Sequence, residues 1–197
     1  MNDQLIAAAE QGDTSALLRL IATGVDLNGR DARGRTALMA ATHANQVQVV
    51  RLLLEAGADV DIQDGQLDNP FLYAGAEGLF EILKLTIAAG ADPSLTNRFG
   101  GTALIPAAER GHVAVVRELL TTTQVDVNHI NNLGWTALLE AIILSDGGEN
   151  HQQVIRLLIS HGADVNIPDR NGVTPLQHAR QRGFQAIEQI LLAAGAV

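Results

Sequence analysis

The sequence predicts an all-α repeat solenoid, a stack of similar helix-turn-helix units, from two recurring motifs. A Gly-x-Asp motif starts at residues 24, 57, 90 and 162, and two of its gaps are 33 residues long. A Gly-x-Thr-x-Leu motif starts at residues 34, 100, 134 and 172. Between the motifs lie pairs of apolar-periodic segments that are too short to be stable helices in isolation. A period near 33 residues therefore indicates units that bury their apolar faces against each other.

Composition narrows the class of protein further. Hydrophobic residues make up 47% of the 197 residues but aromatic residues only 3%, so the core must consist of Ala, Leu, Val and Ile. No apolar run approaches the roughly 18 residues of a membrane span. The start, Met1-Asn2-Asp3-Gln4, is unlike a signal peptide, and we expect a cytoplasmic protein. The absence of cysteine excludes disulfides and Cys-ligated zinc, and the net charge of −9 argues against nucleic acid as a partner.

We expect six units in one repeat domain, at residues 1–30, 31–63, 64–96, 97–130, 131–168 and 169–197. The first unit lacks the Thr-x-Leu opening and begins directly in a helix, as a terminal cap does, because one of its faces meets water. Asp13 or Thr14 is its predicted N-cap between two helices. The sixth unit ends in a more polar helix and is the predicted C-terminal cap.

The second unit carries the full pattern. Gly34 suits a tight turn, the Thr36 hydroxyl can bond the start of the first helix, and Gly57 suits a left-handed helix stop. The buried stripe of the second helix is predicted at Val49, Val50, Leu52 and Leu53. This unit serves as the reference for the others.

Two units depart from this reference. In the third, Leu67 stands where a turn glycine is expected and Thr86 stands where the other units have Leu, so we expect weaker packing there. In the fifth, the second helix arrives five residues late when counted from Thr136. The extra length is predicted at residues 145–151, between the two helices, where repeat proteins accept insertions.

The two motifs, in phase along nearly the whole chain, resemble the ankyrin repeat family. Compact size and an Ala-rich composition resemble the small free-standing ankyrin repeat proteins of bacteria. The resemblance implies helix pairs joined by β-hairpin or loop fingers, and a non-enzymatic module without a cofactor. It implies binding of a partner protein through the concave face and the finger tips. We expect a monomer that binds neither nucleic acid nor membrane.

Positions that the ankyrin scaffold leaves free for binding carry the scarce aromatic residues Tyr73, Phe99 and Trp135, with Leu133 beside them. These side chains are predicted partner contacts, although they could instead pack against a neighbouring finger. Arginines at the finger tips suggest a partner with acidic side chains, or they could pair with aspartates of adjacent fingers; they are Arg30, Arg33, Arg35, Arg98 and Arg170.

The fourth residue after each motif threonine is expected to face the concave side. This row includes Glu140 and His178, which could form an ion pair or share a proton and contribute to partner recognition. No nucleophile elbow, phosphate loop or metalloprotease motif is present. One alternative is a metal-dependent or hydrolytic enzyme that uses Glu149 and His151 of the insert with the Glu140–His178 pair. The other is a structural repeat protein that self-assembles through its end faces.

Overall fold

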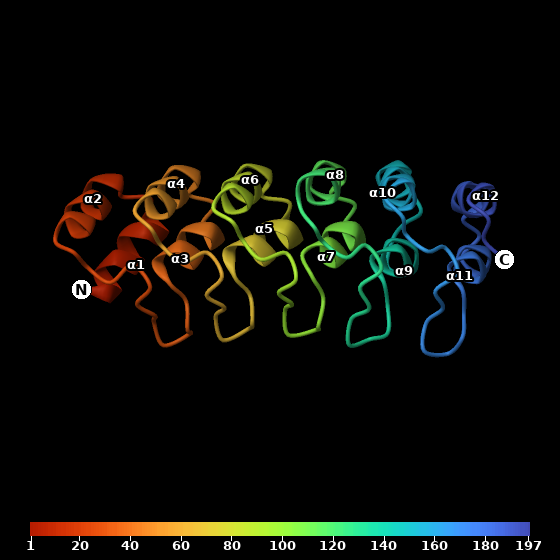
Figure 1. Ribbon diagram of the computed structural model, residues 1–197, viewed down its shortest axis with the longest axis horizontal. Helices are drawn as coiled ribbons and strands as arrows, with labels where there is room; N and C mark the ends of the chain where they lie inside the picture. Colours follow the sequence, from red (N-terminus) through yellow and green to blue (C-terminus); the bar gives the residue numbers. More distant parts are fainter. The chain divides into compact units, whose positions relative to one another are not determined.

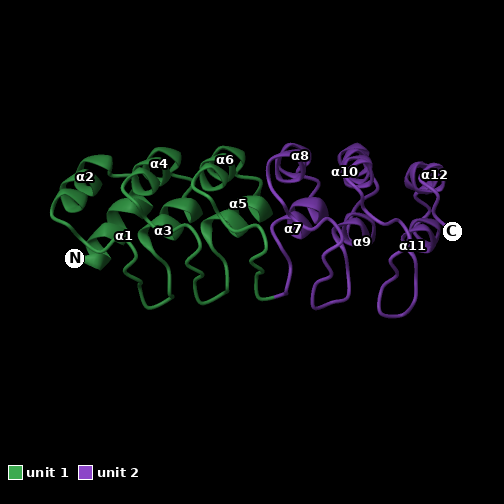
Figure 2. Ribbon diagram, viewed as in Figure 1, with its two compact units in different colours: residues 1–98 green, residues 99–197 purple.

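The computed structural model describes residues 1–197 as twelve α-helices with no strand (Figure 1). The predicted all-α repeat fold is confirmed. The chain divides into two compact units, unit 1 at residues 1–98 and unit 2 at residues 99–197 (Figure 2). The division falls two residues beyond the predicted end of the third repeat at residue 96. The single continuous domain stays a prediction.

Unit 1 contains three helix pairs arranged in two layers (Figure 1). The first helix of each pair packs on the next first helix, and the second helices do the same. We call the two sets inner and outer helices, because long loops extend from the inner set away from the outer set. The pairs are α1 (Asn2–Gln11) with α2 (Thr14–Ala22), α3 (Ala37–His43) with α4 (Val47–Glu55), and α5 (Pro70–Glu77) with α6 (Phe80–Ala88).

Unit 2 repeats the same arrangement with three further pairs. The inner helices α7, α9 and α11 contact in sequence, and the outer helices α8, α10 and α12 do likewise. The pairs are α7 (Leu104–Glu109) with α8 (Val113–Thr122), α9 (Ala137–Ile143) with α10 (Glu149–Ser160), and α11 (Pro175–Gln181) with α12 (Gln185–Ala193).

Small apolar residues make this close stacking of helices possible. In α3, five consecutive residues from Ala37 to Ala41 are fully buried, because neighbours cover this helix on several sides. Alanine lets helix backbones approach, while Leu38 and Met39 fill the remaining space. Each fully buried Leu contributes about 1.5–3 kcal/mol relative to an exposed one, and that burial stabilises helices of only six to twelve residues.

Polar caps mark the start of four inner helices, α3, α5, α9 and α11. Thr36, Thr136 and Thr174 each accept a hydrogen bond from a main-chain N–H three residues later, at 3.2, 3.2 and 3.3 Å. In the third repeat Asn69 takes this role and accepts from the N–H of Leu72 at 2.8 Å. The other half of the Asn69 amide, Nδ2, is buried without a partner. The first repeat resolves the earlier alternative in favour of Asp13, which accepts from the N–H of Ala16.

A finger is the loop that leads into an inner helix. The side chain of the first finger residue holds the loop closed by accepting hydrogen bonds from main-chain N–H groups. In the second finger, residues 31–36, Asp31 Oδ1 accepts the N–H groups of Arg33 at 2.8 Å and Arg35 at 2.9 Å. Main-chain bonds from Asp31 N–H to Arg35 O and from Gly34 N–H to Asp31 O complete the loop. The same pattern recurs in the fingers that begin at Asp64, Asn131 and Asp169.

The acidic residues of the Gly-x-Asp motif have a related structural role. Asp59 Oδ1 accepts from the N–H of Asp61 at 2.9 Å, which shapes the loop after α4. The Asp59 N–H in turn donates to Asn28 of the preceding repeat at 2.9 Å, and the Asp92 N–H donates to Asp61 at 3.0 Å. These bonds join the loops of consecutive repeats within unit 1.

The third repeat departs from the pattern where the sequence indicated. Its Thr86 is fully buried, and the hydroxyl donates to Leu83 O at 2.8 Å, so the polar group is satisfied within the core. Its Leu67 has φ of 59°, whereas the corresponding Gly34 has φ of 78° and Gly172 has φ of 79°. Leu67 therefore occupies a left-handed conformation in which its Cβ is strained.

The insertion in the fifth repeat is divided between a loop and a helix. The sequence placed the extra residues entirely between the two helices, at 145–151. Instead, α10 begins at Glu149 and has 12 residues, against nine in α4. The loop between the helices covers residues 144–148, against 44–46 in the second repeat. The prediction was wrong for residues 149–151, because they satisfy their main-chain bonding by extending the helix.

Replacing Leu67 with glycine should stabilise the protein by roughly 0.5–1 kcal/mol, because glycine adopts positive φ without a Cβ clash. Little packing is lost, since the Leu67 side chain is 50% exposed. Chemical denaturation gives the free energy of unfolding. Gly172→Ala is the matched reverse control, because its added Cβ would meet no atom within 4 Å and only backbone strain is introduced. A lower midpoint for Leu67→Gly would show that the leucine side chain makes a stabilising contact.

Candidate partner-binding surface

Two exposed apolar side chains lie on adjacent, bonded fingers of unit 2. Phe99 in the fourth finger is 52% exposed and Leu133 in the fifth is 49% exposed. The Asn132 N–H donates to Phe99 O at 2.9 Å, and His129 Nε2 lies 2.7 Å from Gly100 O. These bonds fix the two finger tips relative to each other. The structure therefore brings together two of the residues that the sequence predicted as partner contacts.

Trp135 belongs to the same finger as Leu133. Its N–H donates to Asn131 Oδ1 at 3.1 Å and its carbonyl accepts from the Asn131 N–H at 3.0 Å. Its side chain is half-buried. The backbone that carries this indole is thus fixed at both polar groups, while part of the ring stays accessible. Such a partly exposed ring can contact a partner without first being ordered.

Tyr73 lies in unit 1, on α5. Its ring packs on His43 of α3, with ring centroids 4.3 Å apart and a tilt of 50°. The side chain is half-buried, so the predicted contact surface of Tyr73 is reduced by its neighbour. Burial, assisted by the nearby Arg35 charge, lowers the pKa of His43 below its ordinary value. A neutral imidazole therefore covers one side of the tyrosine.

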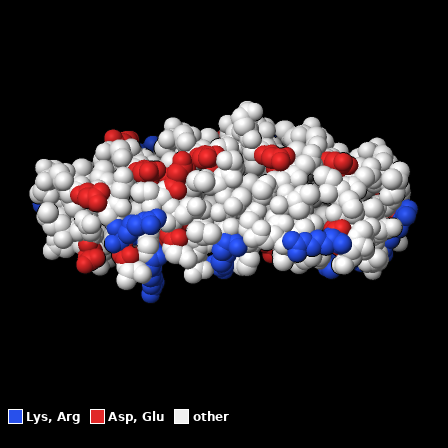
Figure 3. All heavy atoms as spheres, turned by 60° about the horizontal axis from the view of Figure 1, so that its bottom comes forward, with Lys and Arg blue, Asp and Glu red and all other residues white.

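The finger arginines mostly bond neighbouring loops instead of adjacent aspartates. Arg30 donates to Gln63 O, Arg98 donates to Gln66 Oε1, and Arg170 donates to Asn132 O. Arg35 is largely buried, with Nε 2.9 Å from Asp31 of its own finger and NH1 3.2 Å from Glu10. Arg33 has an exposed side chain. Basic side chains form separate patches on the face shown in Figure 3, without a continuous basic stripe.

The row that was expected to face a partner lies instead at the base of the fingers. Ala40 is fully buried and Glu140 is 5% exposed. The expected Glu140–His178 pair is not formed, because each side chain bonds the first residue of its own finger. Asn131 Nδ2 donates to Glu140 Oε1 at 2.7 Å, and His178 Nε2 lies 3.0 Å from Asp169 Oδ2. Sequence reasoning missed these two contacts.

The Asn131–Glu140 and Asp169–His178 contacts could have been predicted by comparing the residue types at equivalent positions of the repeats. An amide at the first finger position stands with an acceptor in the following helix, as Asn131 does with Glu140. A carboxylate at that position stands with a donor, as Asp169 does with His178. The pairing of residue types follows from hydrogen-bond chemistry, since an ionised carboxylate only accepts. The two pairs exchange the donor and the acceptor at equivalent positions.

Glu140 is an ionisable group in an unfavourable place for a charge. Burial and, to a smaller extent, the negative charge of Glu109 on α7 raise its pKa to about 7 against the opposing effect of the bond from Asn131. The pKa of Asp169 moves in the other direction, because the Val173 and Asn171 N–H groups and His178 donate to it against a smaller effect of burial. The carboxyl groups at the base of the fifth and sixth fingers therefore favour different protonation states, since burial favours the neutral form of Glu140 and hydrogen bonds favour the ionised form of Asp169.

The insert of the fifth repeat forms a polar hollow of about 400 Å³. His151 lies at its edge, with Nδ1 3.1 Å from Asp146 Oδ1 and Nε2 2.9 Å from Glu109 O. Glu140 and His178 do not join Glu149 and His151, because the first two are bonded at the base of their own fingers. No group of three or more His, Asp or Glu side chains is arranged to hold a metal ion. The hollow is lined by Arg110, Asp146, Gly148, Glu149, Asn150 and His151.

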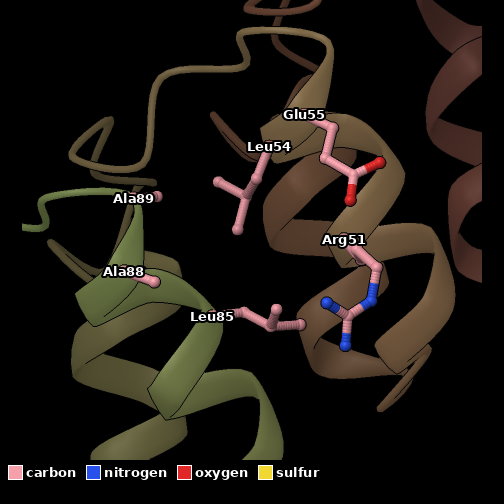
Figure 4. A pocket seen from close by; sticks show the side chains of 6 residues that line it. All are labelled: Arg51, Leu54, Glu55, Leu85, Ala88 and Ala89. Carbon is pink, nitrogen blue, oxygen red and sulfur yellow. The ribbon is translucent and has the colours of Figure 1, made fainter.

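The outer helices carry a second kind of hollow, which recurs in both units. Between α4 and α6, Leu54 and Leu85 point toward each other across a hollow of about 220 Å³, and Arg51 and Glu55 line the α4 side (Figure 4). Equivalent positions line a hollow of about 280 Å³ in unit 2, namely Arg156, Ile159, Ser160, Ile190, Ala193 and Ala194. The repeated spacing of the outer helices accounts for both.

Comparison with known proteins decides the family. The profile described as Ankyrin repeats (3 copies) matches residues 2–64 and 71–169. The chain belongs to the ankyrin repeat family. The matched ankyrin segments cover the fingers that begin at Asp31 and Asn131, and all or nearly all of each helix from α1 to α10. None of the twelve helices combines the length and apolar character needed to span a membrane.

Bacterial ankyrin repeat proteins are similar over nearly the whole chain. The putative ankyrin repeat protein YahD of Escherichia coli K12 is 44% identical over 191 residues, which covers 97% of this chain and 95% of YahD. An ankyrin repeat domain from Acinetobacter baumannii AYE is 53% identical with a TM-score of 0.95, and each chain is 98% covered. The ankyrin repeat domain of Bcl-3 is 26% identical with a TM-score of 0.88, covering 98% of this chain and 86% of that domain.

Glu140→Gln should reduce the loss of stability on raising the pH. The pKa of Glu140 is about 7 in the fold and 4.5 ordinarily, so the folded state holds the proton more tightly. Its stabilising contribution is complete below the ordinary value and is lost as the pH rises toward the folded value. At about 1.4 kcal/mol per pH unit, the loss is roughly 2–3 kcal/mol. Denaturation at about pH 5 and about pH 8 should show a smaller difference for Glu140→Gln than for the wild type or the exposed control Glu149→Gln. Equal differences in all three proteins would contradict the assignment.

Deleting residues 146–150 should leave a folded protein. The deletion would restore a three-residue loop and a nine-residue outer helix, the lengths found in the second repeat. We expect a loss of roughly 1 kcal/mol, because the bond from His151 to Asp146 disappears. Circular dichroism and chemical denaturation test this outcome. Loss of most of the helical signal would show that the insert is required for the packing of the fifth repeat.

Proposed function

We propose that this protein is a non-enzymatic protein-interaction module that binds a partner protein through its fingers. The observation that carries the proposal is the exposure of Phe99 and Leu133 on two fingers joined by a main-chain bond. Large apolar side chains held in a fixed arrangement are effective anchors, because little conformational entropy is lost when they bind. Ankyrin repeat proteins are generally interaction modules, and the family is typically non-enzymatic.

The partner-contact set comprises apolar anchors and polar positions around them. Phe99, Leu133 and Trp135 supply apolar contact in unit 2, and Tyr73 supplies a smaller contact in unit 1. Arg33, Arg98 and Arg170 at finger tips support a partner with acidic side chains, although Arg98 and Arg170 also bond neighbouring loops. Arg35 and Glu140 support the fingers from below, and His178 does so through Asp169.

The remaining parts of the proposal concern the setting of the protein. We propose that it acts as a monomer in the cytoplasm. The net charge of −9 and the separate basic patches in Figure 3 favour a protein partner over nucleic acid. Similarity to the bacterial ankyrin repeat proteins described above supports a bacterial setting.

Trp135→Ala should weaken capture of the partner by roughly 30- to 1,000-fold, since loss of a central anchor costs about 2–4 kcal/mol. Immobilised wild-type and variant proteins are incubated with lysate of the source organism, and captured proteins are quantified by mass spectrometry. Phe99→Ala should reduce capture of the same protein. Thermal melting should shift by only a few degrees, because Trp135 is half-buried and not part of the central core.

Leu18→Ala is the matched control. Leu18 is a large apolar residue that is 50% exposed, but it lies on the outer helix α2 and not on a finger. This variant should capture the partner as well as the wild type does. Equal capture by the wild type, Trp135→Ala and Phe99→Ala would contradict the proposed binding surface.

A further inference from the structure

The base of the fifth finger contains a continuous series of hydrogen bonds from a buried carboxyl group to the tip. Asn131 Nδ2 donates to Glu140 Oε1 at 2.7 Å. Asn131 Oδ1 accepts from the N–H of Leu133 at 2.9 Å and from the N–H of Trp135 at 3.1 Å. One amide side chain therefore joins the inner helix α9 to the two residues that present apolar groups.

We propose that Glu140 makes the fifth finger sensitive to pH: with its carboxyl group protonated the finger is held in the described position, and ionisation loosens it. Glu140 and Asn131 are both buried and bonded to each other. A change in the protonation of Glu140 therefore affects the position of Asn131. The bond from Asn131 stabilises an ionised carboxylate in this place, but burial and the charge of Glu109 destabilise it more, so the carboxylate gains stability by moving toward water. Such a movement takes Oε1 away from Asn131 Nδ2, so the amide that holds both N–H groups of the loop through Oδ1 loses its attachment to α9.

The charged groups around α9 favour this direction of change. Three helices pack on α9, namely α7, α10 and α11. Glu109 of α7 opposes a second negative charge, and His178 of α11 is already held by Asp169. On α10, His151 is bonded to Asp146 and to Glu109 O, and that helix also carries Glu149 and Arg156, both exposed. No Lys, Arg or His lies within salt-bridge distance of Glu140 to stabilise its ionised form.

Two other fingers, which begin at Asp31 and Asp169, lack this device. Asp31 is bonded by Arg35, and Asp169 is bonded by His178, so an acceptor at the first position meets a donor that can carry positive charge. Among these three pairs, Asn131 alone is the donor, and its partner Glu140 is the acceptor. Since the pKa of Glu140 is about 7, the change falls in the ordinary physiological range. If the proposed function holds, the partner binds the fifth finger more tightly below this pH than above it.

The experiment uses the full chain without a partner. Trp135 is the single tryptophan, so its fluorescence reports directly on the fifth finger. Emission is recorded from about pH 5.5 to about pH 8.5, together with amide hydrogen exchange of Leu133 and Trp135 corrected for the intrinsic pH effect. We expect a shift to longer wavelength and a loss of protection as the pH rises, with a midpoint near the Glu140 pKa of about 7.

Two variants decide the assignment, and both retain all six histidines. Glu140→Gln should show neither change across the same range, because its amide does not ionise. Glu109→Gln should keep the transition but move its midpoint to lower pH, because the opposing charge is gone. This second variant keeps the proposal testable if Glu140→Gln fails to fold.

Three outcomes would overturn the inference: no transition in the wild type, the same transition in Glu140→Gln, or an unmoved midpoint in Glu109→Gln. A transition that persists in Glu140→Gln would assign the change to a histidine. None of these measurements involves a partner. Failure of the proposed function would appear separately, as unchanged capture by Trp135→Ala at a single pH.

Discussion

The oxygen acceptor at the first position of the fingers that begin at Asp31, Asp64, Asn131 and Asp169 is the contact on which the presented surface depends. In the second finger Asp31 accepts two N–H groups of the loop and also bonds Arg35, while in the fifth Asn131 accepts two N–H groups and donates to Glu140. The loops contain no strand, so these side chains replace the ladder that a hairpin would provide. A short loop becomes a fixed support because one side chain satisfies several main-chain groups at once.

Much of the fold follows from sequence because repeat proteins restate the same local information. Glycines at equivalent turns, the threonines that cap α3, α9 and α11, and aspartates that shape the outer loops have the roles their residue types predict, whereas the buried Thr102 hydroxyl makes no hydrogen bond. Leu67 replaces the glycine at one of these turns, and it still adopts the left-handed conformation that the position requires. Repetition thus lets a feature in one unit be checked against the others.

The candidate site was less accessible to sequence reasoning, because it depends on which direction a side chain takes. Glu140 was placed on an exposed row, but the structure directs it to the base of its own finger. Arg98 and Arg170 were assigned to a partner or to aspartates, whereas both bond groups of a preceding finger. Long side chains reach several acceptors, and spacing alone does not choose among them.

One of the bonds between consecutive fingers uses only main-chain atoms, and this has an evolutionary consequence. The Gly65 N–H donates to Arg33 O in unit 1, and the Asn132 N–H donates to Phe99 O in unit 2. Any residue except proline supplies the same donor at the second position of a finger. The side chains at the acceptor positions, Arg33 and Phe99, are therefore free to diversify while the tie between loops persists, whereas a Cβ at Gly65 would lie 2.9 Å from Arg33 O. Relatives that share this scaffold can acquire new recognition chemistry at their finger tips without redesigning the support beneath them.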